Sequence, residues 1–317
     1  FVLQNTLDVG AAGLFLGPNA GALSLGMGTT VNVTGSLSGS GGLLKTGDGV
    51  LRLSGTAGGG FTGDVTVNSG ILAIMNSTAL TGATAPVSVG GATGFGFSGG
   101  MLVLDGGTSG MTLSQGVTLA GRGPLATNNT AGVSLLSLGN NIITGPVVLA
   151  GPATSTALAV GYGNTTITGP LSLGFTNTSN ITGNGNLIVS GLISSFENAT
   201  DRFIKSQTNL ATSLWLQNAN NNLLSSVTIS AGFLRVSDGG ALGRNTISNV
   251  QCAAGGTLEV RADAATIPTF VNKTINLAGA NMAYMVVDRA LGGSGLGQTI
   301  TFGSFTFGGQ NRNFYLY

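Results

Sequence analysis

The sequence predicts an all-β protein folded as a parallel β-solenoid, an elongated rod of stacked coils. Three observations lead to this prediction: short alternations of apolar and polar residues, glycine-rich turns between them, and one long pattern that returns later in the chain. Of 317 residues, 56 are glycine and only 7% are charged, yet 42% are hydrophobic and the net charge is +1. Disorder requires low hydrophobicity and high net charge, so this chain can bury a core.

The expected strands are short and alternate with period two. Leu51-Arg52-Leu53, Val65-Thr66-Val67 and Leu258-Glu259-Val260 each place apolar residues on one face and a polar residue on the other. Gly, Asn, Asp and Ser separate such segments, which is typical of strands joined by tight turns. No segment shows helical periodicity, and this argues against a sheet with helical crossovers.

A long repeat predicts two modules. The segments 51–53, 65–67 and 70–74 return about 160 residues later as 214–216, 227–229 and 232–236. We therefore divide the chain into a module of residues 1–158 and a module of residues 159–317, stacked continuously on the first. A module of this length must contain several coils. Each coil would lie about 4.8 Å above the previous one, so that equivalent side chains form ladders.

Residues 42–74 resemble the autotransporter-associated β-strand repeat. The resemblance rests on a Gly-Leu-Lys start, a glycine-rich Leu-x-Leu strand, an aromatic-Thr-Gly turn and a Val-Thr-Val strand before Gly70 and Leu72. A partial second copy, residues 205–236, lacks the paired glycines and the aromatic-Thr-Gly turn. The resemblance implies a right-handed β-helix that forms a passenger or stalk at the bacterial cell surface. The chain departs from the family in lacking a match to its C-terminal translocating domain.

The residue inventory argues against an enzyme. The chain has no histidine, which removes the commonest general base, the usual nucleophilic triads and standard zinc sites. Cys252 is the single cysteine, and a calcium-binding nonapeptide would have to recur, whereas its nearest match occurs once at 58–64. We therefore expect no catalytic residues, no cofactor and no metal.

A second hypothesis remains, that of a carbohydrate-active or carbohydrate-binding β-helix. Such a protein would hold carboxylates about 5 to 10 Å apart in a cleft. A cleft with two or three carboxylates beside Arg202, Arg235 or Arg244 would favour this hypothesis, and the closest pairs in the sequence are Glu259 with Asp263 and Glu197 with Asp201. The ten acidic residues are otherwise scattered along the sequence: Asp8, Asp48, Asp64, Asp105, Glu197, Asp201, Asp238, Glu259, Asp263 and Asp288.

Two segments are candidates for interaction with a partner. Trp215 lies between Leu214 and Leu216, so it faces outward if both leucines face the core. An outward tryptophan is a suitable contact for a glycan or a neighbouring subunit. The segment 197–205 concentrates charge and is expected to project as a loop. Its charged residues are Glu197, Asp201, Arg202 and Lys205.

Both ends of the sequence begin or finish on strand-like segments without polar caps. The residues expected at end-to-end contacts are Leu3, Leu7 and Val9 at one end and Phe314 and Leu316 at the other. We expect further copies of this chain, or its continuation, to stack there, with surface glycans as a second class of partner. The chain has no basic patch for nucleic acid and no apolar run of about 18 residues for a membrane.

These observations predict a non-enzymatic, extracellular structural protein, namely a segment or subunit of a bacterial surface fibre, stalk or adhesin.

Overall fold

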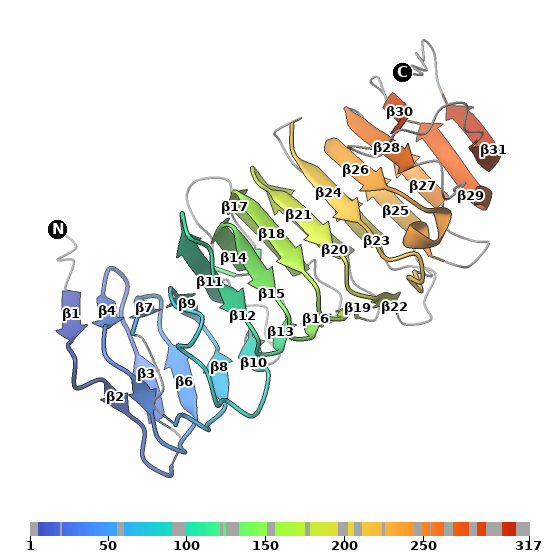
Figure 1. Cartoon of the computed structure of the whole chain (residues 1–317). Helices are drawn as coiled ribbons and strands as arrows, with labels where there is room; N and C mark the ends of the chain where they lie inside the picture. The colour runs from blue at the N-terminus through green and yellow to red at the C-terminus, as the bar shows by residue number, and fades with distance from the viewer. Residues whose placement is uncertain are drawn as a thin grey trace.

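The chain forms an elongated stack of coils from its N-terminal to its C-terminal part (Figure 1). The computed structural model describes residues 6–19, 21–55, 60–90, 99–120, 123–124, 133–150, 156–174, 178–195, 202–205, 211–223, 226–243, 249–253, 255–262, 269–278, 284–289 and 300–308. Every strand pairing among them is between parallel strands that are well separated in sequence. The predicted all-β parallel solenoid is therefore confirmed.

Three large sheets form the faces of the stack. The long sheet has 13 described strands: β1 (Thr6–Val9), β4 (Thr30–Val33), β7 (Val50–Leu53), β9 (Gly70–Ile74), β11 (Gly100–Gly107), β14 (Val133–Gly139), β17 (Thr156–Tyr162), β20 (Thr178–Gly183), β23 (Arg202–Lys205), β25 (Ser226–Ile229), β27 (Asn249–Cys252), β29 (Thr269–Ala278) and β31 (Thr301–Gly308). Because its strands run from β1 to β31, the long sheet is the continuous element of the rod.

Two shorter sheets cover different parts of the rod. The N-side sheet contains β3 (Gly21–Ser24), β6 (Leu43–Thr46), β8 (Val65–Val67), β10 (Val87–Val89), β13 (Val117–Leu119), β16 (Val147–Leu149), β19 (Leu171–Leu173) and β22 (Ile193–Ser195). The C-side sheet contains β12 (Thr112–Leu113), β15 (Asn141–Ile143), β18 (Asn164–Ile167), β21 (Asn186–Val189), β24 (Ser213–Leu216), β26 (Gly232–Val236), β28 (Gly256–Ala262) and β30 (Tyr284–Arg289). A small sheet pairs β2 (Leu14–Phe15) with β5 (Leu37–Ser38) near the N-terminal end.

The core is built from inward columns of aliphatic side chains. Val33, Leu53, Ile74 and Leu104 occupy successive paired positions of the long sheet, and each is at most 2% exposed. This stacking follows from the alternation in the sequence, because in-register parallel strands place equivalent residues directly above one another. Burial of each such side chain contributes about 1.5 to 3 kcal/mol.

At the corners of the coils, a hydroxyl residue followed by glycine recurs at intervals of about 20 to 30 residues. At the corner before the N-side sheet, Thr144-Gly145, Thr168-Gly169 and Ser190-Gly191 follow one another up the stack. The backbone N–H of each hydroxyl residue donates to a carbonyl of the preceding coil at 2.9 to 3.0 Å. A Cβ added to any of these glycines would lie within 2.2 Å of a backbone oxygen, so only glycine fits.

The two copies of the 160-residue pattern lie on different pairs of sheets. In the first copy, β8 and β9 join the N-side sheet to the long sheet, whereas in the second, β25 and β26 join the long sheet to the C-side sheet. Gly70 and Gly232 occupy the same corner position and have φ values of 71° and 70°. The repeated motif therefore specifies a local turn between two strands. The proposed boundary between modules falls inside β17, which pairs with β14 and β20 on either side.

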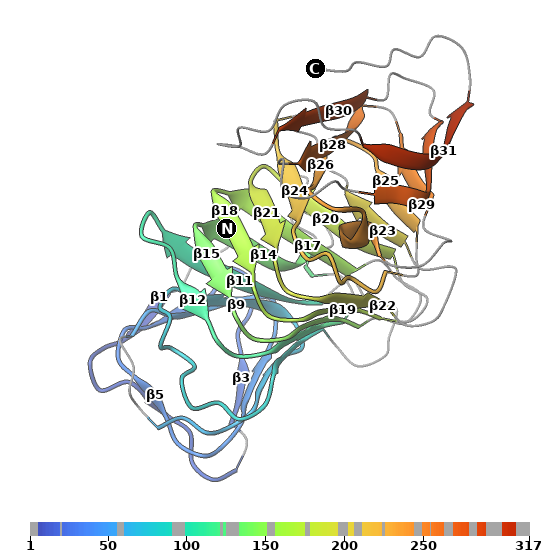
Figure 2. The ribbon, with the colours of Figure 1, turned by 45° about the vertical axis from the view of Figure 1, so that its right-hand side comes forward.

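The cross-section of the rod changes where the N-side sheet ends, in the region between β22 and β25 (Figure 2). Beyond β22 the N-side face continues as an isolated bridge between Ser194 and Asn222 and then as a 3₁₀ helix, η1 (Gly239–Leu242). This short helix is the single helical element in the described part of the chain, and the sequence did not indicate it. No helix within the described ranges is long and apolar enough to span a membrane.

Candidate functional site

Trp215 lies on the outer face of the C-side sheet, as its neighbours predict. Leu214 and Leu216 are fully buried in the core, and Trp215 is half-buried between them on the opposite face. The guanidinium carbon of Arg235 lies 5.4 Å from the centroid of the Trp215 ring, which is within the range of a cation–π interaction. Much of the indole is therefore covered by the next coil, and its Nε1 is buried without a hydrogen-bond partner.

Trp215 belongs to a column of outward residues that runs along the C-side sheet. Successive strand pairings place the following residues in register: Ile188, Trp215, Arg235, Glu259 and Val286. Such a column forms because each outward residue lies over its equivalent in the adjacent coil. Residues separated by 20 or more positions in sequence thus become direct neighbours.

Two residues of this column, Arg235 and Glu259, belong to a network of four charged side chains. Arg235 Nε lies 2.6 Å from Glu259 Oε2, and Arg261 Nε lies 2.5 Å from Glu259 Oε1. Arg261 Nη1 in turn lies 3.0 Å from Asp288 Oδ2. The side chain of Glu259 is only 4% exposed, whereas that of Asp288 is 42% exposed. We define these four residues as the charge ladder.

The charge ladder places one candidate carboxylate, Glu259, beside Arg235, whereas the carbohydrate hypothesis requires two or three in one cleft. Both oxygens of Glu259 accept hydrogen bonds from guanidinium groups and are therefore occupied. A group held in this way is suited to stabilising the coil stack rather than to transferring a proton. Of the other candidates for that hypothesis, Asp201 and Arg244 lie outside the described residues, and only the backbone of Arg202 is described.

The charged segment 197–205 is only partly described. Glu197 and Asp201 lie outside the described residues. Arg202 and Lys205 are the first and last residues of β23, which pairs with β20 and β25 in the long sheet. The expectation of a projecting loop is therefore wrong for residues 202–205, because their backbone completes one strand of the sheet.

Two residues expected at end-to-end contacts, Leu7 and Val9, lie at the N-terminal edge of the long sheet. Leu7 and Val9 pair with Val31 and Val33, and so they continue two inward columns. Leu7 is nevertheless 59% exposed. Leu3, Phe314 and Leu316 lie outside the described residues. At the other end, the sequence reading missed an aromatic group in β31, although the alternation in Thr301–Gly308 is a usable signal.

Lys45 is a buried cation that the sequence reading did not single out. Its side chain lies inside the rod, in the column between Leu23 and Val67, and is 0% exposed. The ammonium group donates to three carbonyl oxygens, those of Thr46 at 2.8 Å, Gly47 at 2.7 Å and Ser69 at 3.2 Å. Burial lowers the pKa of Lys45 to about 8, and the nearby Asp48 carboxylate acts in the opposite direction.

Lys45 makes stability depend on pH. The folded state releases this proton near pH 8, whereas the unfolded chain retains it up to the ordinary pKa of 10.5. Stability should therefore rise as the pH increases through this window, by up to about 3 kcal/mol. We expect chemical unfolding to show a smaller rise in Lys45→Met than in the wild type, with the remainder due to buried Lys273, whose pKa is also lowered by burial. The outward Leu44→Met control should behave as wild type. A difference between wild type and Lys45→Met that stays constant from pH 7 to 10.5 would contradict this assignment.

Asparagine side chains lie along the corners and inside the rod. At one corner, Asn164 N donates to Asn140 Oδ1 at 3.0 Å, and Asn186 Nδ2 donates to Asn164 Oδ1 at 2.9 Å. Inside the rod, Asn221 is 0% exposed. Its Oδ1 accepts from Ile193 N and its Nδ2 donates to Ala241 O, both at 2.9 Å. The amide of Asn221 thus bridges β22 and η1 where the N-side sheet ends.

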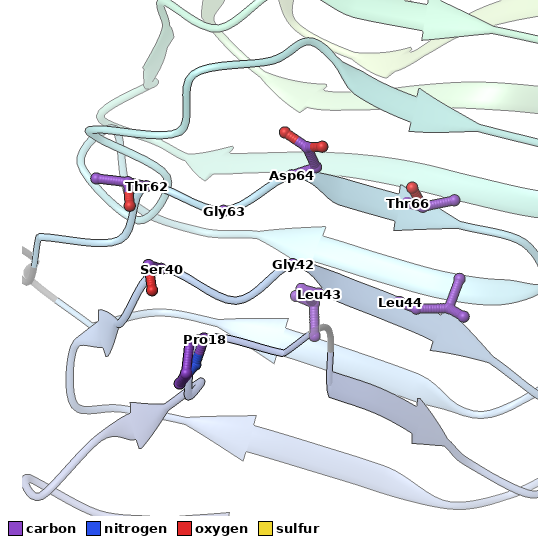
Figure 3. A pocket seen from close by; sticks show the side chains of 9 residues that line it. All are labelled: Pro18, Ser40, Gly42, Leu43, Leu44, Thr62, Gly63, Asp64 and Thr66. Atoms are coloured by element: carbon purple, nitrogen blue, oxygen red, sulfur yellow. The ribbon is translucent and has the colours of Figure 1, made fainter.

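An open groove lies along the N-side sheet near the N-terminal end (Figure 3). It has a volume of about 490 Å³ and follows three successive coils. Pro18, Ser40 and Thr62 line one side, and Leu44 and Thr66 line the other, with Asp64 at the top of the view. The groove offers hydroxyl groups and one carboxylate. The described residues contain no group of three or more His, Cys, Asp or Glu side chains close enough to hold a metal ion.

Comparison with known proteins gives no match to a family model, to a curated protein or to a solved structure. The functional proposal therefore rests on the geometry of the rod and of its outer faces.

Proposed function

We propose that this protein is a non-enzymatic, extracellular structural rod, a segment or subunit of a bacterial surface fibre, stalk or adhesin. The observation that carries the proposal is the long sheet. Its parallel pairing continues from β1 to β31 over columns of buried aliphatic side chains. A tensile load along the axis would be shared by many backbone hydrogen bonds between adjacent coils. The charged side chains of the charge ladder are likewise used to join coils.

The motif that resembles autotransporter repeats supports the surface role, because its residues have structural tasks in this chain. Phe61 is 1% exposed in the core, and Gly47 has a φ of 69° at a corner. A Cβ at Gly63 would lie 2.1 Å from Gly41 O. The motif thus encodes the geometry of a coil, and its resemblance to the autotransporter-associated repeat supports a location outside the cell.

The shape and the location can be tested separately. Small-angle scattering and negative-stain microscopy of the purified chain should show thin rigid rods, and a compact or expanded particle would contradict the structural role. Antibodies against the purified rod should label intact cells of the producing bacterium. Labelling that appears only after lysis would refute the extracellular location but would not contradict the rod shape.

The groove near the N-terminal end favours a second candidate function, binding of a surface glycan. Hydroxyl and carboxylate groups such as Ser40, Thr62 and Asp64 are suitable partners for sugar hydroxyls. A glycan array probed with the wild-type chain should give discrete positives that Asp64→Ala abolishes. Ile142→Asp, a substitution on another face, should leave them unchanged. An array without positives would remove this candidate.

A further inference from the structure

The turn that follows β9 carries a sequence motif that the structural role does not explain. Asn76-Ser77-Thr78 matches the Asn-x-Ser/Thr acceptor sequence of N-linked glycosylation. In a chain rich in Asn, Ser and Thr such matches also arise by chance, so the structure must show which of them is able to react. The further matches in the sequence begin at Asn32, Asn128, Asn164, Asn177, Asn180, Asn198 and Asn272.

Asn76 lies in an exposed turn on the side of the rod. Strand β9 ends at Ile74, and the motif begins two residues later, outside any strand. Met75 is 40% exposed, and Ser77 and Thr78 are exposed as well. Ser77 Oγ accepts a hydrogen bond from the backbone N–H of Thr112 at 2.9 Å, which holds the turn against β12. The rod therefore presents this motif at its surface in a defined conformation.

The side-chain amide of Asn76 is held by its oxygen and free at its nitrogen. Oδ1 accepts from Thr78 N and from Thr78 Oγ1, each at 2.9 Å. Nδ2 of this half-buried residue makes no hydrogen bond to the residues that the structure describes. Among the same residues, the side-chain polar atoms that are buried without a partner are Trp215 Nε1 and Asn276 Oδ1, so Nδ2 of Asn76 reaches solvent. The turn thus exposes the atom that a glycosidic bond requires.

The other matches within the described residues lie in strands. Asn32 is in β4 and Asn164 is in β18, and the Nδ2 of each donates to a side chain of an adjacent coil. Asn180 and Asn272 belong to β20 and β29, which pair with neighbouring coils on both sides. A strand paired in this way does not project its backbone as a turn does. The remaining matches, at Asn128, Asn177 and Asn198, lie outside the described residues.

Resting on the extracellular role proposed above, we infer that Asn76 is an N-glycosylation site whose donor is a sugar linked to a diphosphate. Asn76 Nδ2 forms a bond to the anomeric carbon of the sugar, while the bond from this carbon to the diphosphate oxygen breaks. The diphosphate leaves with the electron pair of that bond, and one Nδ2 proton passes to a base of the transferase. The rod supplies the nucleophile, and a separate glycosyltransferase supplies the base. Lipid-linked and nucleotide-linked sugars share this chemistry.

Peptide mapping by mass spectrometry tests the inference on the folded wild-type chain. One sample receives a lipid-linked oligosaccharide diphosphate and an oligosaccharyltransferase, and the other receives a nucleotide diphosphate hexose and a soluble asparagine N-glycosyltransferase. Asn76 should gain the sugar in at least one sample, which identifies the donor, while Asn32 and Asn164 gain none. An unmodified Asn76 in both samples would overturn the inference, and so would equal modification of Asn32 or Asn164.

Thr78→Val and Thr78→Ser form a matched pair, because valine removes the hydroxyl donor to Asn76 Oδ1 and serine retains it. Thr78 is exposed, so both variants should fold as the wild type does by circular dichroism. Thr78→Val should lose the modification and Thr78→Ser should keep it, whereas equal modification of both would contradict the inference.

The chain isolated from the producing bacterium should carry a sugar on Asn76. A bare Asn76 on rods that antibodies detect on intact cells would refute the glycosylation without affecting the proposed function. Absence of the rod from the cell surface would instead refute the proposed function, because the antibody test does not depend on the sugar.

Discussion

Replacing Asn221 by leucine is expected to lower the free energy of unfolding by about 2 to 5 kcal/mol. The side chain is fully buried and joins Ile193 N of β22 to Ala241 O of η1. Leucine has a similar volume but neither donor nor acceptor, so it would leave a buried N–H and a buried carbonyl without these partners. The loss should concentrate at the site where the rod passes from three sheets to two.

Chemical denaturation measures the loss of stability, and amide hydrogen exchange shows where in the rod the loss occurs. The amide of Ile193 should lose protection in Asn221→Leu, while amides in distant strands such as β13 should keep theirs. Asn220→Leu is the control, because Asn220 is exposed in the same turn. If the two variants were equally stable, the bridging role of Asn221 would be excluded.

Replacing Glu259 by glutamine is expected to lower the free energy of unfolding by about 2 to 4 kcal/mol. The substitution retains the shape of the side chain but removes the charge that lies between Arg235 and Arg261. Two guanidinium groups, each 20% exposed, would then repel each other across a neutral amide. The cation–π contact between Arg235 and Trp215 should weaken as well, because Glu259 orients the guanidinium.

Urea denaturation, together with tryptophan fluorescence from the single indole of the chain, is the appropriate measurement. Asp288→Asn provides the control, since Asp288 is 42% exposed and a surface ion pair contributes at most about 1 kcal/mol. A second variant, Arg235→Met combined with Glu259→Met, removes both charges and should recover part of the lost stability. Equal effects of Glu259→Gln and Asp288→Asn would show that the ladder acts only as surface charge.

The candidate interaction residues show what a sequence pattern leaves undetermined. The alternation at Leu214-Trp215-Leu216 correctly placed both leucines in the core and the indole outside. It could not show that Arg235 of the next coil covers the ring, because the two residues meet only when β24 and β26 pair. Glu259 was a candidate acid in the sequence and is the central acceptor of an ion network in the structure. Position in the coil stack decides between these roles.

The sequence by itself determined the fold class, because alternation and glycine corners are local properties. Apolar residues at every second position require strands with one buried face, and Gly70 and Gly232 adopt the same turn in both copies of the repeat. Only the tertiary structure decided which sheets each turn joins, N-side to long in one copy and long to C-side in the other. It also decided that Lys45 points inward and that Asn221 completes the end of a sheet. The physical reason is that a turn fixes only the angle between two strands. The sheet to which each strand belongs depends on how many strands every coil contributes to the stack.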